Sequence, residues 1–274
     1  MENQVVSLSI HDATITLDIP TFLIKKLKKL DIRFSSDMYD VACIHIHPLN
    51  DWYVRFCVED NHVVIENTVV KVDQVLFRLF VEIEDLLMRQ MLYKNSSRIA
   101  LHGGGIVSNG KAILVLQEKG AGKSTLIAKL AQNKTHRYLS DDLLITNGKT
   151  VLGVPLPMRL RQLKVQGLDL MGSMTESGLD IDNRIRHFYM PTIEAETSEI
   201  PVSAILIPHY DPQSSNYIIK AKGNEKARII INQIKRYPNM EQMYKNLLLL
   251  SNSINVYHLH YKDFSVLDSH FIRD

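Results

Sequence analysis

A short glycine-containing run constrains this chain more than any other feature. It occupies residues 117–125 and reads QEKGAGKST. An apolar segment at 112–116 leads into it, and the helical pattern LIAKLA at 126–131 follows it. A strand, a glycine turn, Lys-Ser-Thr and a helix are the order of elements in a phosphate-binding loop. The alternative is an ordinary strand-to-helix turn that carries Gly-Lys-Ser by chance, and the flanking elements favour the loop.

The residue types in this run suit a nucleotide and its metal ion. Glycines let backbone amides curve around phosphate oxygens, and a helix N-terminus adds partial positive charge. Lys123 would reach the β- and γ-phosphates of ATP, and the Ser124 hydroxyl would help to hold Mg²⁺. The consensus has a glycine where this chain has Gln117. The residues expected to bind the nucleotide are Lys119, Gly120, Ala121, Gly122, Lys123, Ser124 and Thr125.

Two hairpins are predicted around the loop. Residues 99–107 read as one strand, Asn109-Gly110 as a two-residue turn, and 112–116 as the returning strand. After the helix, 139–146 reads as a strand that turns at Asn147-Gly148 and returns. Because the strand before the loop is half of a hairpin, the fold class expected is α/β with a mixed sheet.

An acidic pair follows the loop at a useful distance. Asp141 and Asp142 come 18 residues after Lys123, at a strand that should lie beside the loop. One carboxylate can accept a proton from an attacking hydroxyl, and the other can hold Mg²⁺. We take Asp141 as the base and Asp142, with Ser124, as the metal ligand, although the two could exchange roles. The alternative for the pair is a solvated turn.

Basic and imidazole groups complete the candidate site. His102 precedes three glycines on the strand expected to pair with the loop strand, so it should reach the same edge of the sheet. It could orient an aspartate or contact phosphate, although a lone histidine is more often structural. Guanidinium groups stay charged and bind oxygens in pairs, which suits a transferring phosphoryl group. The candidates are Arg159, Arg161, Arg184 and Arg186, the last two in a glycine-containing segment, 164–192, that could cover the site.

The first part of the chain reads as a separate β-rich α+β domain. Strands are expected at 5–19, 41–47, 53–58 and 62–70, and a helix at 73–93. We therefore predict domains at 1–94 and 95–274, with a recognition role for the first. A helix with four lysines at 23–30 reads as a solvated basic face, or as a docking patch for an acidic peptide. His45 and His47 lie two residues apart, but no third metal ligand has a recognisable spacing.

Composition excludes several classes of function. A formal net charge of +2 gives no field that would suggest nucleic-acid or membrane binding. The start of the chain lacks a basic and apolar leader, so a cytoplasmic location is expected. The two cysteines, Cys43 and Cys57, have no metal or redox spacing and are expected to be small buried residues.

With these residues assembled, the segment from His102 to Arg161 resembles the bacterial HPr kinase/phosphorylase family, whose catalytic domain is related to phosphoenolpyruvate carboxykinase. The likeness is carried by His102-Gly103, by GAGKS at 120–124 and by YLSDD at 138–142. It implies a kinase-type P-loop domain and ATP-dependent phosphorylation of a serine on a peptide or small protein. It also implies that His102 supports the catalytic aspartate, and that the protein self-associates.

Departures from that family narrow the expectation. The glycine-rich signature expected after the acidic pair is replaced by PLPMRLR at 155–161. The chain looks more like the divergent relatives found in biosynthetic clusters for ribosomally made peptides, including lasso peptides, which phosphorylate a serine near the C-terminus of the precursor. Three alternatives remain: a kinase of a small hydroxyl compound such as free serine or a sugar, an ATP-binding regulator without transfer activity, and a peptide-binding partner.

Overall fold

The computed structural model describes residues 3–30, 53–59, 62–65, 68–71, 73–117, 120–171 and 175–268. The strand expected at 41–47, with His45 and His47, lies outside these residues, as does Lys119. The chain divides into two compact units. Unit 1 contains Met1–Met91 and Ser173–Met190, and unit 2 contains Leu92–Gly172 and Pro191–Asp274. The break at Met91 lies close to the expected boundary at residue 94, whereas Ser173–Met190 groups with the first unit.

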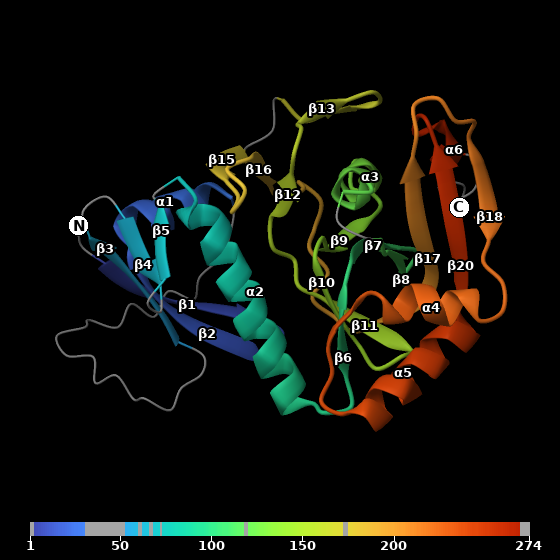
Figure 1. The fold of residues 1–274 in the computed structure, drawn as a ribbon, viewed down its shortest axis with the longest axis horizontal. Helices are drawn as coiled ribbons and strands as arrows, with labels where there is room; N and C mark the ends of the chain where they lie inside the picture. Colours follow the sequence, from blue (N-terminus) through green and yellow to red (C-terminus); the bar gives the residue numbers. More distant parts are fainter. Residues whose placement is uncertain are drawn as a thin grey trace. The chain divides into compact units, whose positions relative to one another are not determined.

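Unit 1 is built on a five-stranded sheet (Figure 1). The chain turns at His11-Asp12 between the first two strands, which pair antiparallel, and the second strand pairs parallel with the third. The strands lie in chain order across the sheet, and two helices belong to the same part of the chain. These elements are β1 (Asn3–Ile10), β2 (Ala13–Pro20), α1 (Thr21–Lys29), β3 (Tyr53–Glu59), β4 (His62–Ile65), β5 (Thr68–Lys71) and α2 (Val75–Lys94).

A hairpin from later in the chain belongs to unit 1. Strands β15 (Thr175–Leu179) and β16 (Ile185–Tyr189) pair antiparallel. Phe188 stacks on Phe80 of α2 with ring centroids 5.2 Å apart. Part of the segment expected to cover the site is therefore a hairpin packed on the first unit, because its apolar side chains find partners there.

The basic helix α1 also contacts this hairpin. Lys29 Nζ lies 2.9 Å from a Glu176 carboxylate oxygen, and Lys26 Nζ lies 3.8 Å from the other. Two of its four lysines therefore face a carboxylate of the protein itself, which favours the interpretation of α1 as an ordinary basic face over a docking patch.

Unit 2 contains a ten-stranded mixed sheet. Its order is β19-β6-β10-β11-β17-β8-β7-β9, and β20 lies between β17 and β18. β8 pairs antiparallel with β7 and parallel with β17, so the predicted α/β class with a mixed sheet is confirmed. The strands are β6 (Ile99–His102), β7 (Gly104–Ser108), β8 (Lys111–Val115), β9 (Arg137–Ser140), β10 (Leu143–Thr146), β11 (Thr150–Gly153), β17 (Ile200–Tyr210), β18 (Tyr217–Lys220), β19 (Ile234–Arg236) and β20 (Asn255–Tyr261).

Helices cover the sheet of unit 2. Ile230 of α4 and Leu247 and Leu250 of α5 join the apolar core formed with Ile205, Ile207 and other sheet residues. Strand β19 lies between these two helices in the chain. The remaining elements of the unit are α3 (Lys123–Leu130), β12 (Met158–Leu160), β13 (Lys164–Val165), β14 (Leu168–Asp169), α4 (Glu225–Ile231), α5 (Met240–Ser253) and α6 (Ser265–Asp268). No helix among the described residues is long and apolar enough to span a bilayer.

Both predicted turns are present. Asn109 and Gly110 have φ angles of 49° and 71° and join β7 to β8, which is the conformation that Asn-Gly supplies in a two-residue hairpin loop. Gly148 has a φ angle of 90° between β10 and β11. Local turn chemistry is thus sufficient to position both hairpins.

Two predicted strands are each broken in two. The strand expected at 99–107 ends at His102 and restarts at Gly104, because β6 pairs with β10 and β19 whereas β7 pairs with β8 and β9. The strand expected at 139–146 is interrupted at Asp141-Asp142. The chain at the two breaks lies in direct contact, because a Cβ added to Gly104 would lie 2.3 Å from the Ser140 carbonyl oxygen. The glycines therefore allow two backbones to cross without side chains between them.

Candidate functional site

The described part of the predicted phosphate loop has two glycines and a helix start whose backbone suits anion binding. Gly120 and Gly122 have φ angles of 100° and 90°, in the left-handed region that glycine favours. Helix α3 begins at Lys123, and the Gly122 carbonyl accepts from the Leu126 amide at 2.9 Å. As at every α-helix, the amides of the first turn have no intrahelical acceptor, so they are available to phosphate oxygens.

Gln117, which replaces a glycine of the consensus, fits this backbone without strain. It is not among the residues with positive φ. Its side-chain amide lies 3.4 Å from the Pro208 carbonyl oxygen and connects the loop to the neighbouring strand β17. No glycine is needed at this position.

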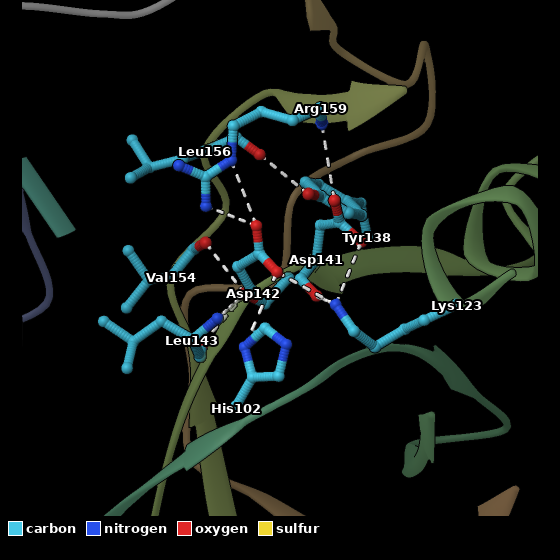
Figure 2. Close-up of polar contacts among 10 residues, drawn as sticks. His102, Lys123, Tyr138, Asp141, Asp142, Leu143, Val154, Leu156 and Arg159 are labelled. Carbon is cyan, nitrogen blue, oxygen red and sulfur yellow. Dashed lines mark hydrogen bonds and ion pairs between the residues drawn. The ribbon is translucent and has the colours of Figure 1, made fainter. Parts of the chain in front are cut away.

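The acidic pair lies at the turn between β9 and β10, and neighbouring hydroxyl groups fix that turn. The Ser140 hydroxyl is within hydrogen-bonding distance of the carbonyl oxygens of Leu143 (2.7 Å) and Val154 (3.0 Å). The Tyr138 hydroxyl donates to the Leu156 carbonyl at 2.7 Å (Figure 2). Sequence reasoning used Tyr138 and Ser140 only as part of a resemblance. The signal for their structural role was two hydroxyl residues directly before the acidic pair.

Lys123 connects the loop to the acidic pair. Its Nζ donates to Asp142 Oδ1 and to the Asp141 carbonyl oxygen, each at 2.9 Å, and lies 3.9 Å from Asp141 Oδ1. The side chain is buried. Burial alone would lower the pKa of Lys123, but the two carboxylates outweigh it and raise that pKa. The lysine is therefore a fixed positive charge between the loop and the carboxylates, as Figure 2 shows.

Asp142 is surrounded by cationic side chains. Arg159 Nε donates to Asp142 Oδ2 at 3.1 Å, its Nη2 contacts the same oxygen, and Lys123 holds Oδ1. Burial alone would raise the pKa of Asp142, but Arg159 and Lys123 hold it well below the usual range. The carboxyl group is therefore ionised at neutral pH. Its side chain keeps 15% of its surface exposed.

Asp141 has a different environment although it is the adjacent residue. It is 4% exposed, and its Oδ1 is buried with no hydrogen-bond donor among the described residues. Its Oδ2 accepts from the Arg159 backbone amide at 3.4 Å. Burial raises the pKa of Asp141, opposed by the nearby Lys123 and by the Ser124 hydroxyl.

His102 lies in the same cluster, but on a different strand from the one predicted. It stands on β6, which pairs with β10 and β19, and not on the strand that pairs with β8. Its Nδ1 lies 3.7 Å from Asp142 Oδ1, too far for a hydrogen bond. Burial, with Lys123 nearby, lowers the pKa of His102 to about 4, so the ring is neutral at pH 7.

The four candidate arginines separate into two groups. Arg159 binds Asp142 of the acidic pair. Arg161 is exposed and lies beside the loop, since a Cβ added to Gly120 would lie 3.6 Å from Arg161 Nη2. Arg186 instead forms a buried ion pair with Asp180 within unit 1. Arg184 gives its backbone amide to the same aspartate. Spacing in the sequence could not distinguish these two uses of arginine.

The donor set of the cluster can be tested against Mg²⁺. Hydroxyl and carboxylate oxygens are hard ligands, and Mg²⁺ in phosphate-transfer sites uses one or two protein carboxylates together with substrate phosphates and water. The unpartnered Asp141 Oδ1 and the hydroxyl of Ser124 fit that requirement. Within the part of the chain that the structure describes, no three His, Cys, Asp or Glu side chains form a metal-binding group by themselves.

Comparison with known proteins adds no relative. No model of a known protein family matches the chain. No curated protein matches it either. A helix N-terminus, a buried lysine, two carboxylates in different environments and two guanidinium groups can bind a polyphosphate and assist the transfer of its terminal group.

Proposed function

We propose that this protein is a Mg²⁺- and ATP-dependent kinase that phosphorylates a serine on a peptide or small protein. The observation that carries the proposal is the position of Lys123: the first residue of α3 donates from Nζ to both members of the acidic pair. An anion-binding helix start and a candidate base are thus separated by one lysine side chain. A γ-phosphate bound at the helix start and a hydroxyl held by that base could therefore come within the roughly 3–3.5 Å that reacting atoms require.

The two aspartates receive roles from their contacts. Asp142 is the base that we propose, because it is ionised, partly exposed and beside His102, so an acceptor hydroxyl can reach it. Asp141 is buried and its Oδ1 accepts no hydrogen bond from a described residue, so this oxygen and the Ser124 hydroxyl would hold Mg²⁺, which would neutralise phosphate charge when bound. This exchanges the roles first expected for the pair, an exchange that the sequence leaves open.

The transfer step follows from these roles. The serine oxygen of the acceptor forms a bond to the γ-phosphorus while the bond from that phosphorus to the β,γ-bridging oxygen breaks. The hydroxyl proton passes to Asp142, and ADP leaves from the loop. Lys123, Arg159 and Arg161 stabilise the charge that spreads over the phosphoryl oxygens. The neutral His102 ring adds no competing positive charge beside the base.

The test is transfer of label from γ-labelled ATP to serine-containing peptides, with mass spectrometry of a co-expressed precursor peptide as the second readout. Transfer by the wild type and its loss in Lys123→Met would support the proposal. ATP binding without transfer to any hydroxyl would indicate a regulator. Transfer to free serine or a sugar but to no peptide would indicate a small-molecule kinase. The measurement does not depend on the compartment in which the protein is located. A cytoplasmic protein would have direct access to ATP.

A further inference from the structure

The topology of unit 2 distinguishes two sides of the phosphate loop. The loop follows β8, whose neighbours are β7 on one side and β17 on the other. β9, which leads into the acidic pair, lies beyond β7. On the opposite side, β17 and then β20 run parallel to β8, so their carboxyl ends lie at the same edge of the sheet as the loop. The acidic pair lies by the start of β7, because the Gly103 amide donates to the Asp142 carbonyl oxygen at 3.3 Å, and the ends of β17 and β20 lie on the other side of β8.

A tyrosine ends each of the two strands on that other side. Tyr210 is the last residue of β17 and Tyr261 the last of β20, and their ring centroids are 5.5 Å apart. Both lie against the loop: a Cβ on Gly122 would be 3.1 Å from the Tyr261 hydroxyl oxygen and 3.8 Å from the Tyr210 Cβ. Tyr261 is 1% exposed, whereas Tyr210 is 52% exposed. The buried ring supports the loop, and the other presents an aromatic surface directly beside it.

We infer that Tyr210 is a nucleobase-stacking residue of the nucleotide site. If the γ-phosphate faces the acidic pair, the α-phosphate and nucleoside extend away from it, toward the ends of β17 and β20. An exposed aromatic ring at that position offers a π-face to a base, which is a favourable contact for any base. This inference rests on the proposed function only in that a nucleotide occupies the loop, and it assigns the nucleoside side of the site.

The experiment separates the base from the phosphates. Affinities of the full chain are measured by calorimetry for ATP, ADP and inorganic tripolyphosphate, each with Mg²⁺. The variants are Tyr210→Ala and Tyr210→Phe, and the matched control is Tyr244→Ala, which removes a tyrosine of similar exposure (50%) from α5. Tyr210→Ala should weaken ATP and ADP binding about tenfold, in the range for base stacking, and leave tripolyphosphate binding unchanged. Tyr210→Phe and Tyr244→Ala should bind all three like the wild type.

Two results would overturn the inference. One is unchanged ATP affinity in Tyr210→Ala, and the other is an equal loss of tripolyphosphate affinity, which would mean that the ring supports the loop and not a base. The kinase proposal fails separately: a wild type that binds ATP but transfers no phosphate ends that proposal and leaves the assignment of Tyr210 intact. A wild type that binds neither ATP nor tripolyphosphate ends both.

Discussion

Each unit contains an arginine–aspartate ion pair, and the two pairs differ in whether the polar groups around them all have hydrogen-bond partners. In unit 1, Asp180 Oδ1 accepts from the amides of Asp182 and Arg184, each at 2.9 Å, and Oδ2 accepts from Arg186 Nε, also at 2.9 Å. Asp180 is only 1% exposed. Each oxygen has its donors inside the fold, as expected of an ion pair that fixes a turn.

In unit 2, the pair of Arg159 and Asp142 belongs to a cluster that is not complete. Asp141 Oδ1 and His102 Nδ1 are both buried without a hydrogen-bond partner among the described residues. Such groups cost free energy in the absence of a ligand, and such sites commonly have a function. An ion pair is therefore a weak indicator of function by itself, and a stronger one where neighbouring buried polar atoms make no hydrogen bond.

The largest expected difference is in phosphate transfer. Asp142→Asn should lower the transfer rate by roughly 10²–10⁴, the usual contribution of a positioned general base. Its stability should also fall, because Lys123 and Arg159 would lose the counter-charge that they share, so the rate is corrected for the folded fraction. Single-turnover kinetics with labelled ATP measure the rate. Asp180→Asn, corrected for the folded fraction, should transfer like the wild type, and a comparable loss in that variant would remove the distinction.

The second prediction concerns the ion pair in unit 1, whose loss should affect the stability of the fold and not ATP binding. Asp180→Asn should destabilise the protein by about 3 kcal/mol, because it leaves the Arg186 guanidinium buried without a counter-charge. ATP affinity of the folded protein should not change. Urea unfolding followed by circular dichroism measures the free energy of unfolding. A loss of less than about 1 kcal/mol would contradict a structural role for the pair in unit 1.

A third, smaller effect concerns the glycine beside the acidic pair. Gly104→Ala should cost about 2 kcal/mol, because the new methyl group would meet the Ser140 carbonyl oxygen at 2.3 Å and the Asp141 Cα at 2.5 Å. It should also lower transfer. The control is Gly110→Ala, where no atom lies within 4 Å of the new methyl group and only the positive φ is unfavourable, at about 1 kcal/mol. Equal transfer rates in the two variants would refute the link between this glycine and the site.

The smallest effect is a pH dependence. The pKa of His102 is about 4 in the folded protein and about 6.5 when unfolded, so the unfolded chain binds the proton more tightly. Stability from this group is complete above pH 6.5 and is lost as the pH falls toward 4. With the side chain 29% exposed, we expect the loss to be about 1 kcal/mol. Unfolding of wild type and His102→Gln at pH 7 and 4.5, without Mg²⁺, measures it; equal losses in both would contradict the prediction.

A feature of this fold could be predicted from the sequence where neighbouring residues alone determine it. The loop, its helix and the Asn-Gly turns are set by neighbouring residues, so the mixed sheet and most of the cluster could be predicted. The break at Gly103 could not, because it is caused by a crossing with residues far along the chain. The same holds for the β15–β16 hairpin, whose Phe188 packs on α2. Charge alone likewise could not separate Arg186 from Arg159.

The crossing at Gly104 has a consequence for how variable this molecule can be. Where two main chains touch directly, the separation between them is fixed by atoms that every amino acid possesses, and not by the shapes of particular side chains. Apolar residues elsewhere in the sheet can therefore be exchanged at a cost in folding free energy without moving the carboxylates relative to the lysine. The accuracy of the site therefore depends on a position beside the carboxylates that must remain without a side chain.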